Sequence, residues 1–581
     1  MHFLKTLFIL TITISLAVAI EAMTINTAQQ LDSVNSSFQE SSANYKDFNQ
    51  NVTLSEIIYN EKSTKMLMDM LINNEAKTFS HLSHKKFIQN IYQKNRYLPF
   101  WFNSYGIKRA KVDELFRAID RDITLNKNGR IRKQFHYLNN KIKNTKKREL
   151  KNELKLDLEL SALYRTYIGY HISGGIDWWS FQKRLSALRK QKIAANWAPY
   201  NPRYDIANLM LNYPLSHVLS VTTPNSFGYK KMIKELKRLR KVQESGGWKK
   251  IPHSSRLTYG RSGKVVKQLK RRLQSEGDYT CKQLNSTYDQ CLKKAVKQFQ
   301  KRHGLYPSGA INKLTRKKLN LSVNWKIKKL LLNIDRIKRL PDQPEDRYIM
   351  VNIPDFKLYY KENGKEKLTM KVIVGDKKHH TPIFSNKVSF IVLNPYWLMP
   401  DSIVQKEIIP KILKNPNYLK EKGYEVRMNY NFKKPPIDTS KIDWAKILRN
   451  GQTKKYKFMQ PPGPKNALGK IKFKFPNRFA VYLHDTPTKR LFKKGWRTFS
   501  HGCIRIEKPS ALLKTFAKHE NSVNYARAKK ILQGKEKTQI NLSQKVPVHI
   551  VYLTAWINSD GLLHYRPDVY GYDSKQHRSN Y

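Results

Sequence analysis

The chain has 581 residues, too long for a single hydrophobic core, and its 40% hydrophobic content is ample for several folded domains. Lys and Arg total 110 against 44 Asp and Glu, and the resulting net charge of +66 requires an anionic partner or surrounding, unless it reflects a lysine-rich proteome. The cations are spread along the chain without a zinc-finger, helix-turn-helix or RNA-binding motif, which argues against specific nucleic-acid binding and favours cell-wall carboxylates or an acidic membrane surface.

An export signal is predicted at the N-terminus. A short basic start precedes an apolar run from Leu7 to Ile20, and small residues suited to cleavage follow. The run is short and interrupted by hydroxyl residues, so a spanning helix is the less favoured alternative. We therefore assign residues 1–22 to a signal peptide or uncleaved anchor and expect the protein in the periplasm or cell envelope. Residues 23–53, rich in Ser, Asn, Gln and Thr, are expected to form a flexible tether.

Helical patterns dominate residues 54–250, which we expect to form a helical scaffold domain. One apolar stripe per helix indicates a bundle. The aromatic clusters at 97–102 and 177–179 favour core packing, with sugar stacking as the alternative. A typical stripe, spaced i, i+3, i+4 and i+7, consists of Val112, Leu115, Phe116 and Ile119.

Residues 251–325 predict a small module of three helices. Asp289 is placed to cap the second helix, and a third short helix ends at Leu319. Cys281 and Cys291 are ten positions apart in the loop between the first two helices. Because an exported protein can keep disulfides, we expect these two cysteines to pair and Cys503 to remain a free thiol.

From about residue 345 to 575 the apolar period changes from 3.6 to 2, which indicates a mostly β domain. Asn363-Gly364 between two alternating runs predicts a tight hairpin. Residues 401–469 break the strand rhythm with helical and proline-rich pieces. A loop of this length is usually functional, and we interpret it as a lid insertion over a site.

The strongest chemical pattern lies between His484 and Arg505. A predicted strand at 480–483 would present His484, and a glycine turn, Ser500-His501-Gly502-Cys503, would present the cysteine. A cysteine nucleophile needs a base because the thiolate is its reactive form. Gly502 permits a tight turn whose backbone N–H groups can converge on an oxyanion. Zinc ligation by this cluster lacks the paired spacing of known sites, so we predict no metal and no cofactor.

The spacing of His484 and the Ser-His-Gly-Cys-x-Arg sequence resembles the signature of the YkuD-type L,D-transpeptidases. The resemblance implies that Cys503 is the nucleophile, that His484 is the general base oriented by a backbone carbonyl, and that a carbapenem acylates the cysteine. The segment 299–305 similarly resembles a peptidoglycan-binding module, and the order of the parts resembles the large multi-domain form of the family. The resemblance further implies oxyanion and loop support from Gly502, Ser500, His501 and Arg505, and we expect substrate contacts from Tyr482 and Arg505.

The sequence therefore predicts a multi-domain α+β protein with a helical scaffold, a peptidoglycan-binding-like module and a mostly β YkuD-like catalytic domain. The expected activity transfers the acyl group of a tetrapeptide stem to a neighbouring stem amine, with release of D-alanine and formation of a 3→3 cross-link. Hydrolysis of the same bond, transfer to another amine, and a non-catalytic wall-binding scaffold are the alternatives. Stem peptides are the expected partners, and other cell-wall enzymes are left open.

Overall fold

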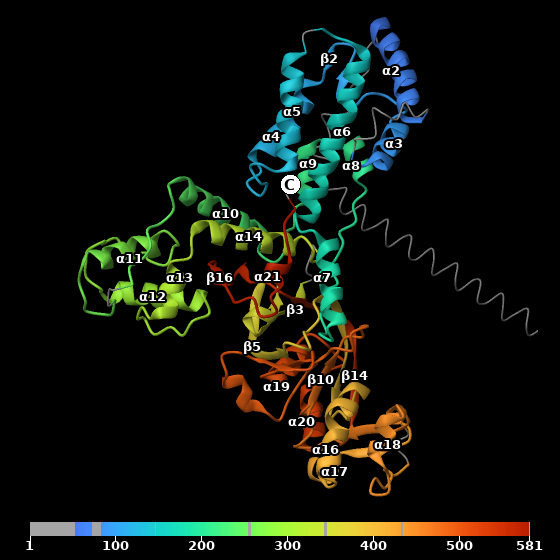
Figure 1. Cartoon of the computed structure of the whole chain (residues 1–581), viewed down its shortest axis with the longest axis vertical. Coiled ribbons are helices and arrows are strands. Elements are labelled where there is room, and N and C mark those ends of the chain that lie inside the picture. The colour runs from blue at the N-terminus through green and yellow to red at the C-terminus, as the bar shows by residue number, and fades with distance from the viewer. Residues whose placement is uncertain are drawn as a thin grey trace, which may run out of the picture.

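A computed structural model describes residues 53–72, 83–145, 147–253, 257–341, 346–430 and 434–579. The predicted signal segment and nearly all of the predicted tether lie outside these residues. Within the described ranges, no helix has the length and apolar character needed to cross a membrane. The predicted multi-domain α+β class is confirmed: Figure 1 shows a helical scaffold at the top, a helical module at the left and a sheet domain below.

The scaffold core is built around α6 (Leu150–Ser173), a helix that is buried on most of its surface. Asp157 of α6 is fully buried and accepts hydrogen bonds from the backbone N–H groups of Phe100, at 3.1 Å, and Trp101, at 2.7 Å. A buried carboxylate is costly unless its oxygens are bonded, so these contacts fix the aromatic segment in the core. Around α6 lie α2 (Leu54–Ile72), α3 (Lys85–Lys94), β1 (Phe102–Asn103), β2 (Gly106–Ile107), α4 (Arg109–Arg121), α5 (Arg130–Asn144), α8 (Ile206–Asn212) and α9 (Leu215–Thr222).

Two helices of the predicted scaffold range pack away from that core. Helix α7 (Trp178–Lys190) places Phe181 and Leu185 in the core of the sheet domain. Helix α10 (Tyr229–Glu244) packs against α14 (Val323–Ile337), which also lines the sheet domain. The scaffold therefore contacts the sheet domain directly through its own helices.

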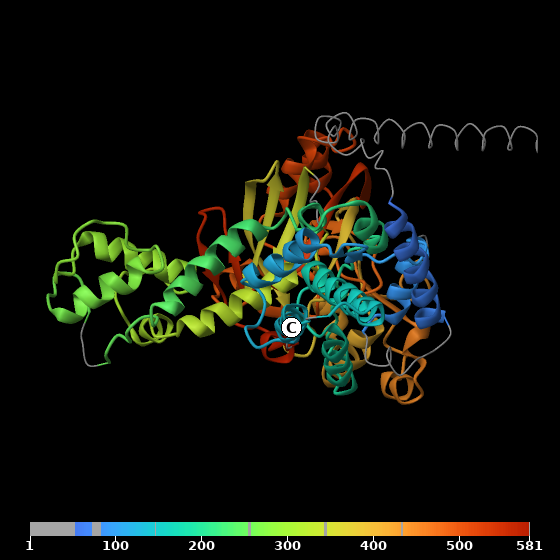
Figure 2. The ribbon, with the colours of Figure 1, turned by 90° about the horizontal axis from the view of Figure 1, so that it is seen from above.

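The module is inserted between α10 and α14 and projects to one side in both ribbon views (Figures 1 and 2). It contains α11 (Lys264–Gln274), α12 (Gln290–Arg302) and α13 (Lys313–Leu319). Asp289 caps α12 as predicted, because its Oδ1 accepts a hydrogen bond from the N–H of Leu292 at 2.8 Å. Cys281 and Cys291 are joined by a disulfide with their Cα atoms 6.6 Å apart, and Cys503 is free.

The chain enters and leaves this module along two segments that are bonded to each other. Asn320 donates to the carbonyl of Ile251 at 2.9 Å and accepts from its N–H at 2.8 Å. The indole N–H of Trp248 donates to the carbonyl of Leu321 at 2.9 Å. Two adjacent connections therefore join the module to one pair of packed helices.

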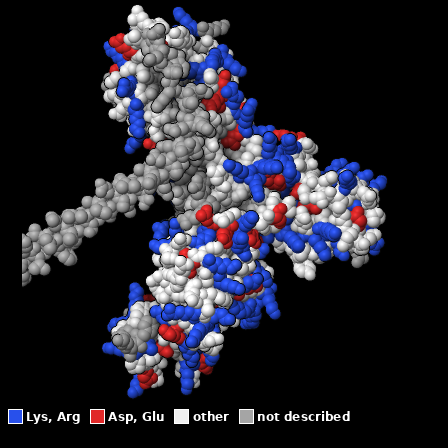
Figure 3. All heavy atoms as spheres, turned by 180° about the vertical axis from the view of Figure 1, so that it is seen from behind, with Lys and Arg blue, Asp and Glu red and all other residues white. Residues whose placement is uncertain are grey.

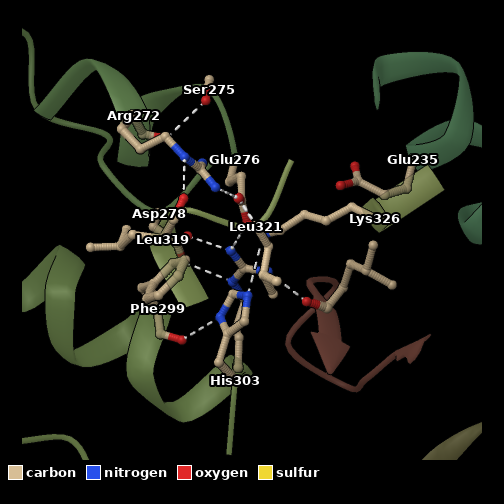
Figure 4. Close-up of polar contacts among 12 residues, drawn as sticks. Glu235, Arg272, Ser275, Glu276, Asp278, Phe299, His303, Leu319, Leu321 and Lys326 are labelled. Carbon is tan, nitrogen blue, oxygen red and sulfur yellow. Dashed lines mark hydrogen bonds and ion pairs between the residues drawn. The ribbon is translucent and has the colours of Figure 1, made fainter. Parts of the chain in front are cut away.

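A buried charge network docks the module against the rest of the chain (Figure 4). The carboxylate of Glu276 lies 2.9 Å from Arg302 and also pairs with Arg272 and with Lys326 of α14. Burial alone would raise the pKa of Glu276, but these three cations hold it well below its usual value. Arg302 also donates to the carbonyl of Leu563, at 2.6 Å, in β16 (Leu563–Tyr565). Buried charged side chains of the module thus attach it to the rest of the chain.

Nine strands form the main sheet, in the order β12-β5-β13-β11-β10-β6-β14-β3-β4. Strand β4 also pairs with β5 through the predicted hairpin at Asn363-Gly364, so the sheet curls back on itself. The strands are β3 (Arg347–Asn352), β4 (Lys357–Glu362), β5 (Lys365–Gly375), β6 (Phe384–Leu393), β10 (Ile471–Lys474), β11 (Leu483–His484), β12 (Thr498–Ser500), β13 (Ile504–Ile506) and β14 (Thr538–Val551). Helices α19 (Pro509–Ala517), α20 (Tyr525–Gln533) and α21 (Tyr572–Lys575) and the β15 (Ala555–Ile557) and β16 hairpin complete this domain.

The predicted lid insertion is a subdomain with its own apolar core at the lower end of Figure 1. It starts slightly earlier than predicted, because β7 (Trp397–Leu398) already pairs with β9 (Lys457–Gln460) in a separate three-stranded sheet. Its other elements are α15 (Asp401–Ile403), a short π-helix (Val404–Ile408), α16 (Ile409–Lys414), α17 (Tyr418–Lys422), β8 (Glu425–Arg427) and α18 (Trp444–Arg449).

Cationic side chains cover the scaffold, the module and the sheet domain on the face that Figure 3 shows, while acidic side chains form small groups. The charge is therefore distributed over the units and is not confined to one of them on this face.

Candidate active site

The predicted catalytic residues are carried by the middle of the main sheet. Strand β11 runs parallel to β13, and His484 is the register partner of Arg505. On the other side, β11 runs antiparallel to β10, where Lys472 is paired with His484. Cys503 directly precedes β13, and its thiol is close enough to Lys472 and Arg505 for their charges to interact with it. The histidine, the cysteine and the two cations therefore lie close together.

Strand β11 is shorter than the predicted strand, which was expected to begin at residue 480. Ala480 has a φ of +53°, in the left-handed region that side chains disfavour. Asn477 holds this bend, because its Oδ1 accepts from the N–H of Phe479 at 3.0 Å and its Nδ2 donates to the carbonyl of Val481 at 2.8 Å. The bend points the Ala480 carbonyl toward Sγ of Cys503, at 3.8 Å.

His484 is 4% exposed, and the main chain orients its ring. Nδ1 donates to the carbonyl of Asp485 at 2.6 Å, which leaves the lone pair of the neutral ring on Nε2. Burial lowers the pKa of His484 to about 3, and the charges of Arg505 and Lys472 act in the same direction. The imidazole is therefore neutral at physiological pH and can accept a proton.

The side chain of Asp485 stabilises the loop that follows the histidine. Its carboxylate accepts from the N–H groups of Lys470, at 2.9 Å, and Thr486, at 2.7 Å, and pairs with Lys489. Gly469 has a φ of +60°, and a Cβ there would lie 2.4 Å from Cγ of Asp485. The close approach of this loop to Asp485 therefore requires glycine at position 469.

Hydrogen bonds fix the loop that carries Cys503. The hydroxyl of Ser500 donates to the Cys503 carbonyl at 2.5 Å, and the Ser500 carbonyl accepts from the N–H of Asp376 at 2.8 Å. Thr381 donates its hydroxyl to the carbonyl of Gly502 at 2.8 Å. These contacts restrain the main chain on both sides of Cys503.

The two backbone amides expected to hold an oxyanion differ in their contacts. The N–H of Gly502 donates to Oγ of Ser500 at a long 3.3 Å, and Gly502 has a φ of +106°. The N–H of Cys503 has no hydrogen-bond acceptor in the part of the chain that the structure describes. It is thus the donor that this loop leaves for a developing negative charge.

The thiol of Cys503 is partly exposed and lies beside Tyr482 and Lys472. Removal from bulk water raises the pKa of Cys503, whereas the Tyr482 backbone N–H, the Lys472 charge and the Tyr482 hydroxyl favour the thiolate. Nζ of Lys472 lies 4.0 Å from the centre of the Tyr482 ring, and burial lowers the pKa of Lys472 to about 8. Burial thus disfavours both the thiolate of Cys503 and the protonated ring of His484.

Arg505 and His501 face different neighbours. Arg505 donates to Oγ1 of Thr488 at 3.4 Å, while its Nε has no partner among the described residues. Burial lowers the pKa of Arg505 and the charge of Cys503 raises it, which places the guanidinium near the thiol. His501 Nε2 lies 2.6 Å from Oε1 of Glu407 in the insertion. His501 therefore connects the cysteine loop to the insertion.

A cavity of about 570 Å³ adjoins the cysteine loop at Gly502. Part of its wall comes from the scaffold range, through Gln182, Arg189 and Trp197. The sequence analysis missed these residues, because no local pattern signals their contact with a loop that lies far along the chain. Within the described ranges, no group of three or more His, Cys, Asp and Glu side chains is arranged to hold a metal ion.

Comparison with known families identifies three parts of the chain. Residues 346–528 match the L,D-transpeptidase catalytic domain (YkuD), residues 262–319 match a domain described as "Putative peptidoglycan binding domain", and residues 86–236 match a scaffold domain. The predicted resemblance to the multi-domain L,D-transpeptidases is therefore confirmed at the level of these domains.

Individual relatives agree with these matches. A Haemophilus influenzae protein named "Putative L,D-transpeptidase" is 36% identical over 245 residues, which are 42% of this chain and 48% of that protein. The match thus spans about half the length of this relative. Two solved L,D-transpeptidase structures are also similar. The one from Xylanimonas cellulosilytica is 14% identical with a TM-score of 0.17 and covers 52% of this chain and 100% of that chain. The one from Stackebrandtia nassauensis is 15% identical with a TM-score of 0.20 and covers 52% of this chain and 96% of that chain, and both TM-scores are too low to bear on the fold.

Proposed function

We propose that this chain is a peptidoglycan L,D-transpeptidase of the cell envelope, with Cys503 as nucleophile and His484 as general base. The observation that carries the proposal is the strand register, which places His484 beside Arg505 and Lys472, the two cations whose charges also interact with Cys503. A thiol, a neutral imidazole and an available backbone N–H are the parts that acyl transfer requires. The match of residues 346–528 to the L,D-transpeptidase catalytic domain supplies the substrate class.

In the first half-reaction, Nε2 of His484 takes the thiol proton of Cys503 as Sγ attacks the carbonyl carbon of the L-centre that precedes the terminal D-alanine. The oxyanion forms against the N–H of Cys503. When the intermediate collapses, the C–N bond breaks and His484 returns the proton to the leaving amine. D-alanine departs, and a thioester joins the stem to Cys503.

In the second half-reaction, a side-chain amine of a neighbouring stem attacks the thioester carbon and gives its proton to His484. The C–S bond breaks, the sulfur is reprotonated, and a 3→3 cross-link remains. Water attacking the same thioester gives hydrolysis instead. Arg505 lies beside His484 and near the thiol, so we assign it the positioning of substrate or of the cysteine loop.

The insertion is the proposed lid. Glu407, in the short π-helix of the insertion, contacts His501 of the cysteine loop, so closure of the insertion and the geometry of the loop are linked. Excluding water from the thioester favours amine attack over hydrolysis.

The proposed substrate lies outside the cytoplasm, which fits the export signal predicted at residues 1–22. The match of residues 262–319 to a peptidoglycan-binding domain supports a wall-binding role for the module. An anionic envelope surface would also attract a chain with a net charge of +66.

Incubation of the purified chain with tetrapeptide-bearing muropeptides, followed by mass analysis of the products, tests the function. We expect dimers cross-linked 3→3 together with free D-alanine. Tripeptides alone would assign the chain to hydrolysis, and unchanged tetrapeptides with no thioester on Cys503 would favour the wall-binding scaffold.

A further inference from the structure

The cavity beside the cysteine loop is assembled from two parts of the chain. Its walls are formed by Gln182, Arg189, Ala194, Asn196 and Trp197 from the scaffold side and by His380, Pro382, Arg478, Phe479, Val481, His501 and Gly502 from the sheet domain.

The scaffold wall is fixed in position by main-chain bonds. The segment that follows α7 runs beside residues 378–383, with Ala194 N–H donating to the Lys378 carbonyl at 2.7 Å and Ala198 N–H to the Ile383 carbonyl at 2.8 Å. This second segment includes Thr381, whose hydroxyl holds Gly502. The wall and the cysteine loop are therefore parts of one bonded assembly.

The cavity is lined by residues adjacent in sequence to the proposed nucleophile and to its neighbour Ala480. Gly502 directly precedes Cys503, and Val481 directly follows Ala480, whose carbonyl lies 3.8 Å from Sγ. A peptide group bound in the cavity would therefore lie beside the cysteine loop.

The charge of the cavity is positive. Arg189 and Arg478 both line it, and none of its lining residues is acidic. Arg478 is exposed, stacks over Phe479 at 5.0 Å, and has no ion-pair partner among the described residues. Arg189 donates one N–H, at 2.8 Å, to the carbonyl of Ala195. Each guanidinium thus retains donors that can bind a carboxylate.

Two nearby carboxylates are already bonded. Glu407 pairs with His501, and Asp376 accepts from the backbone N–H groups of Lys378 and His379 and from the His379 ring. Apolar groups of Trp197, Phe479 and Pro382 complete the wall beside the two arginines. The cavity therefore combines an apolar surface with two guanidinium groups, which suits a short peptide that carries a carboxylate.

We propose that this cavity is a substrate subsite in which Arg189 and Arg478 bind a free carboxylate of a stem peptide. The inference rests on the proposed function and adds a specificity-determining role for the scaffold. The carboxylate could belong to the donor stem or to the acceptor stem. Measuring the two half-reactions separately distinguishes these two sources.

The test uses the full chain and two forms of a synthetic tetrapeptide stem, one with all carboxylates free and one with its non-terminal carboxylates amidated. Arg189→Ala and Arg478→Ala are expected to raise KM about 10-fold for the free form, in line with loss of a charge-assisted hydrogen bond. The amidated form should be a poorer substrate for the unaltered chain and should respond little to either substitution. Lys replacements should recover only part of the loss, because an ammonium lacks the planar fork of arginine.

Lys190→Ala is the matched control, since Lys190 is exposed on the same helix and does not line the cavity. Alkylation of Cys503 by iodoacetamide, a small neutral reagent, should proceed at the same rate in all variants. An effect already present in thioester formation from donor alone assigns the carboxylate to the donor stem. An effect only on the partition between amine and water assigns it to the acceptor.

Equal losses on the free and amidated peptides, or an equal loss in Lys190→Ala, would overturn the subsite. If the unaltered chain processes neither peptide, the proposed function fails, and binding of the peptides to Cys503→Ala protein decides the subsite separately. Binding of the free form must then weaken about 10-fold in either arginine variant, and unchanged binding would refute the inference.

Discussion

Oε1 of Glu407 lies 2.6 Å from Nε2 of His501. The first residue belongs to the insertion and the second is two positions before Cys503, so the pair joins the insertion to the cysteine loop. From this contact we expect His501 to position the loop, a role distinct from proton transfer.

Glu407→Gln should therefore weaken the attachment of the insertion. Because a less firmly closed insertion admits water to the thioester, we expect the share of hydrolysed product to rise several-fold relative to cross-linked product. Product analysis by mass measures this ratio. Glu421→Gln, on an exposed glutamate elsewhere in the insertion, is the control and should leave the ratio unchanged. An unchanged ratio in Glu407→Gln would show that the contact has no part in closure.

The proposed roles of the cysteine and the histidines predict an order of severity. Cys503→Ala should abolish acyl transfer while preserving the fold, because one small side chain replaces another. His484→Ala should slow the reaction by roughly 10²-fold or more, which is the usual scale of general base catalysis. His501→Ala should have a smaller effect. Rate measurements that reverse the order of the two histidines would show that the base is wrongly assigned.

The environment of His484 predicts an unusual pH profile. Its pKa of about 3 keeps the ring neutral throughout the usual assay range, whereas burial raises the pKa of the Cys503 thiol. Because neither group changes its protonation state in the neutral range, acylation should stay nearly level there and show no step near pH 6.5, the value expected for an ordinary histidine. The rate of thioester formation, measured by quenching the reaction at a series of pH values, tests this prediction. A clear step near 6.5 would mean that the titrating base is a solvated histidine.

The same shift predicts the direction of acid destabilisation. An unfolded chain binds a proton on His484 near pH 6.5, but the folded chain does not until about pH 3. The unfolded state thus binds more protons in this interval, and the free energy of unfolding must fall as the pH is lowered through it. His380 and His549, each with a pKa lowered to about 4 by burial, act in the same direction. Denaturant titrations at several pH values should show the decline.

A carbapenem should add to the protein once, on the peptide that contains Cys503. The strained amide carbonyl needs a thiolate, an oxyanion donor and an accessible groove, so the adduct reports on all three. Cys503→Ser should react far more slowly, because a hydroxyl is a weaker nucleophile than a thiolate. Intact-mass and peptide analysis measure the adduct. Labelling at other positions, or none on Cys503 in folded protein, would favour the non-catalytic scaffold.

Glu276→Gln should destabilise the chain by about 3–5 kcal/mol, because it leaves buried Arg272, Arg302 and Lys326 without their shared counter-charge. Chemical unfolding measures the loss, and Glu244→Gln, on an exposed glutamate at the end of α10, is the control. A loss below about 1 kcal/mol would indicate that water reaches the network.

The parts of the site that depend on short sequence distances were predictable. The turn at Gly502 and the hairpin at Asn363-Gly364 follow from local residue preferences, and the free thiol of Cys503 follows from the number and spacing of the three cysteines. The start of β11 was not predictable in the same way, because the side chain of Asn477 replaces strand bonds with a bend. The expected start of this strand at residue 480 is wrong for that reason, whereas Leu483 lies in β11 as expected.

Contacts between distant segments could not be read from the sequence. Nothing in the pattern of α7 distinguishes a helix that packs on the scaffold from one that places Phe181 in the sheet domain, since both need an apolar stripe. The pairing of Glu407 with His501 likewise depends on how the insertion folds over the sheet.

The paired hydrogen bonds between Ile251 and Asn320 have a consequence for how such a chain can be rearranged by evolution. Because the two connections of the module already lie side by side, a short linker could replace the module without displacing α10 or α14. The geometry thus permits gain or loss of the module in one step. Removal would take away Glu276, the partner of Lys326, but it would also uncover the ammonium of Lys326, which water could then solvate.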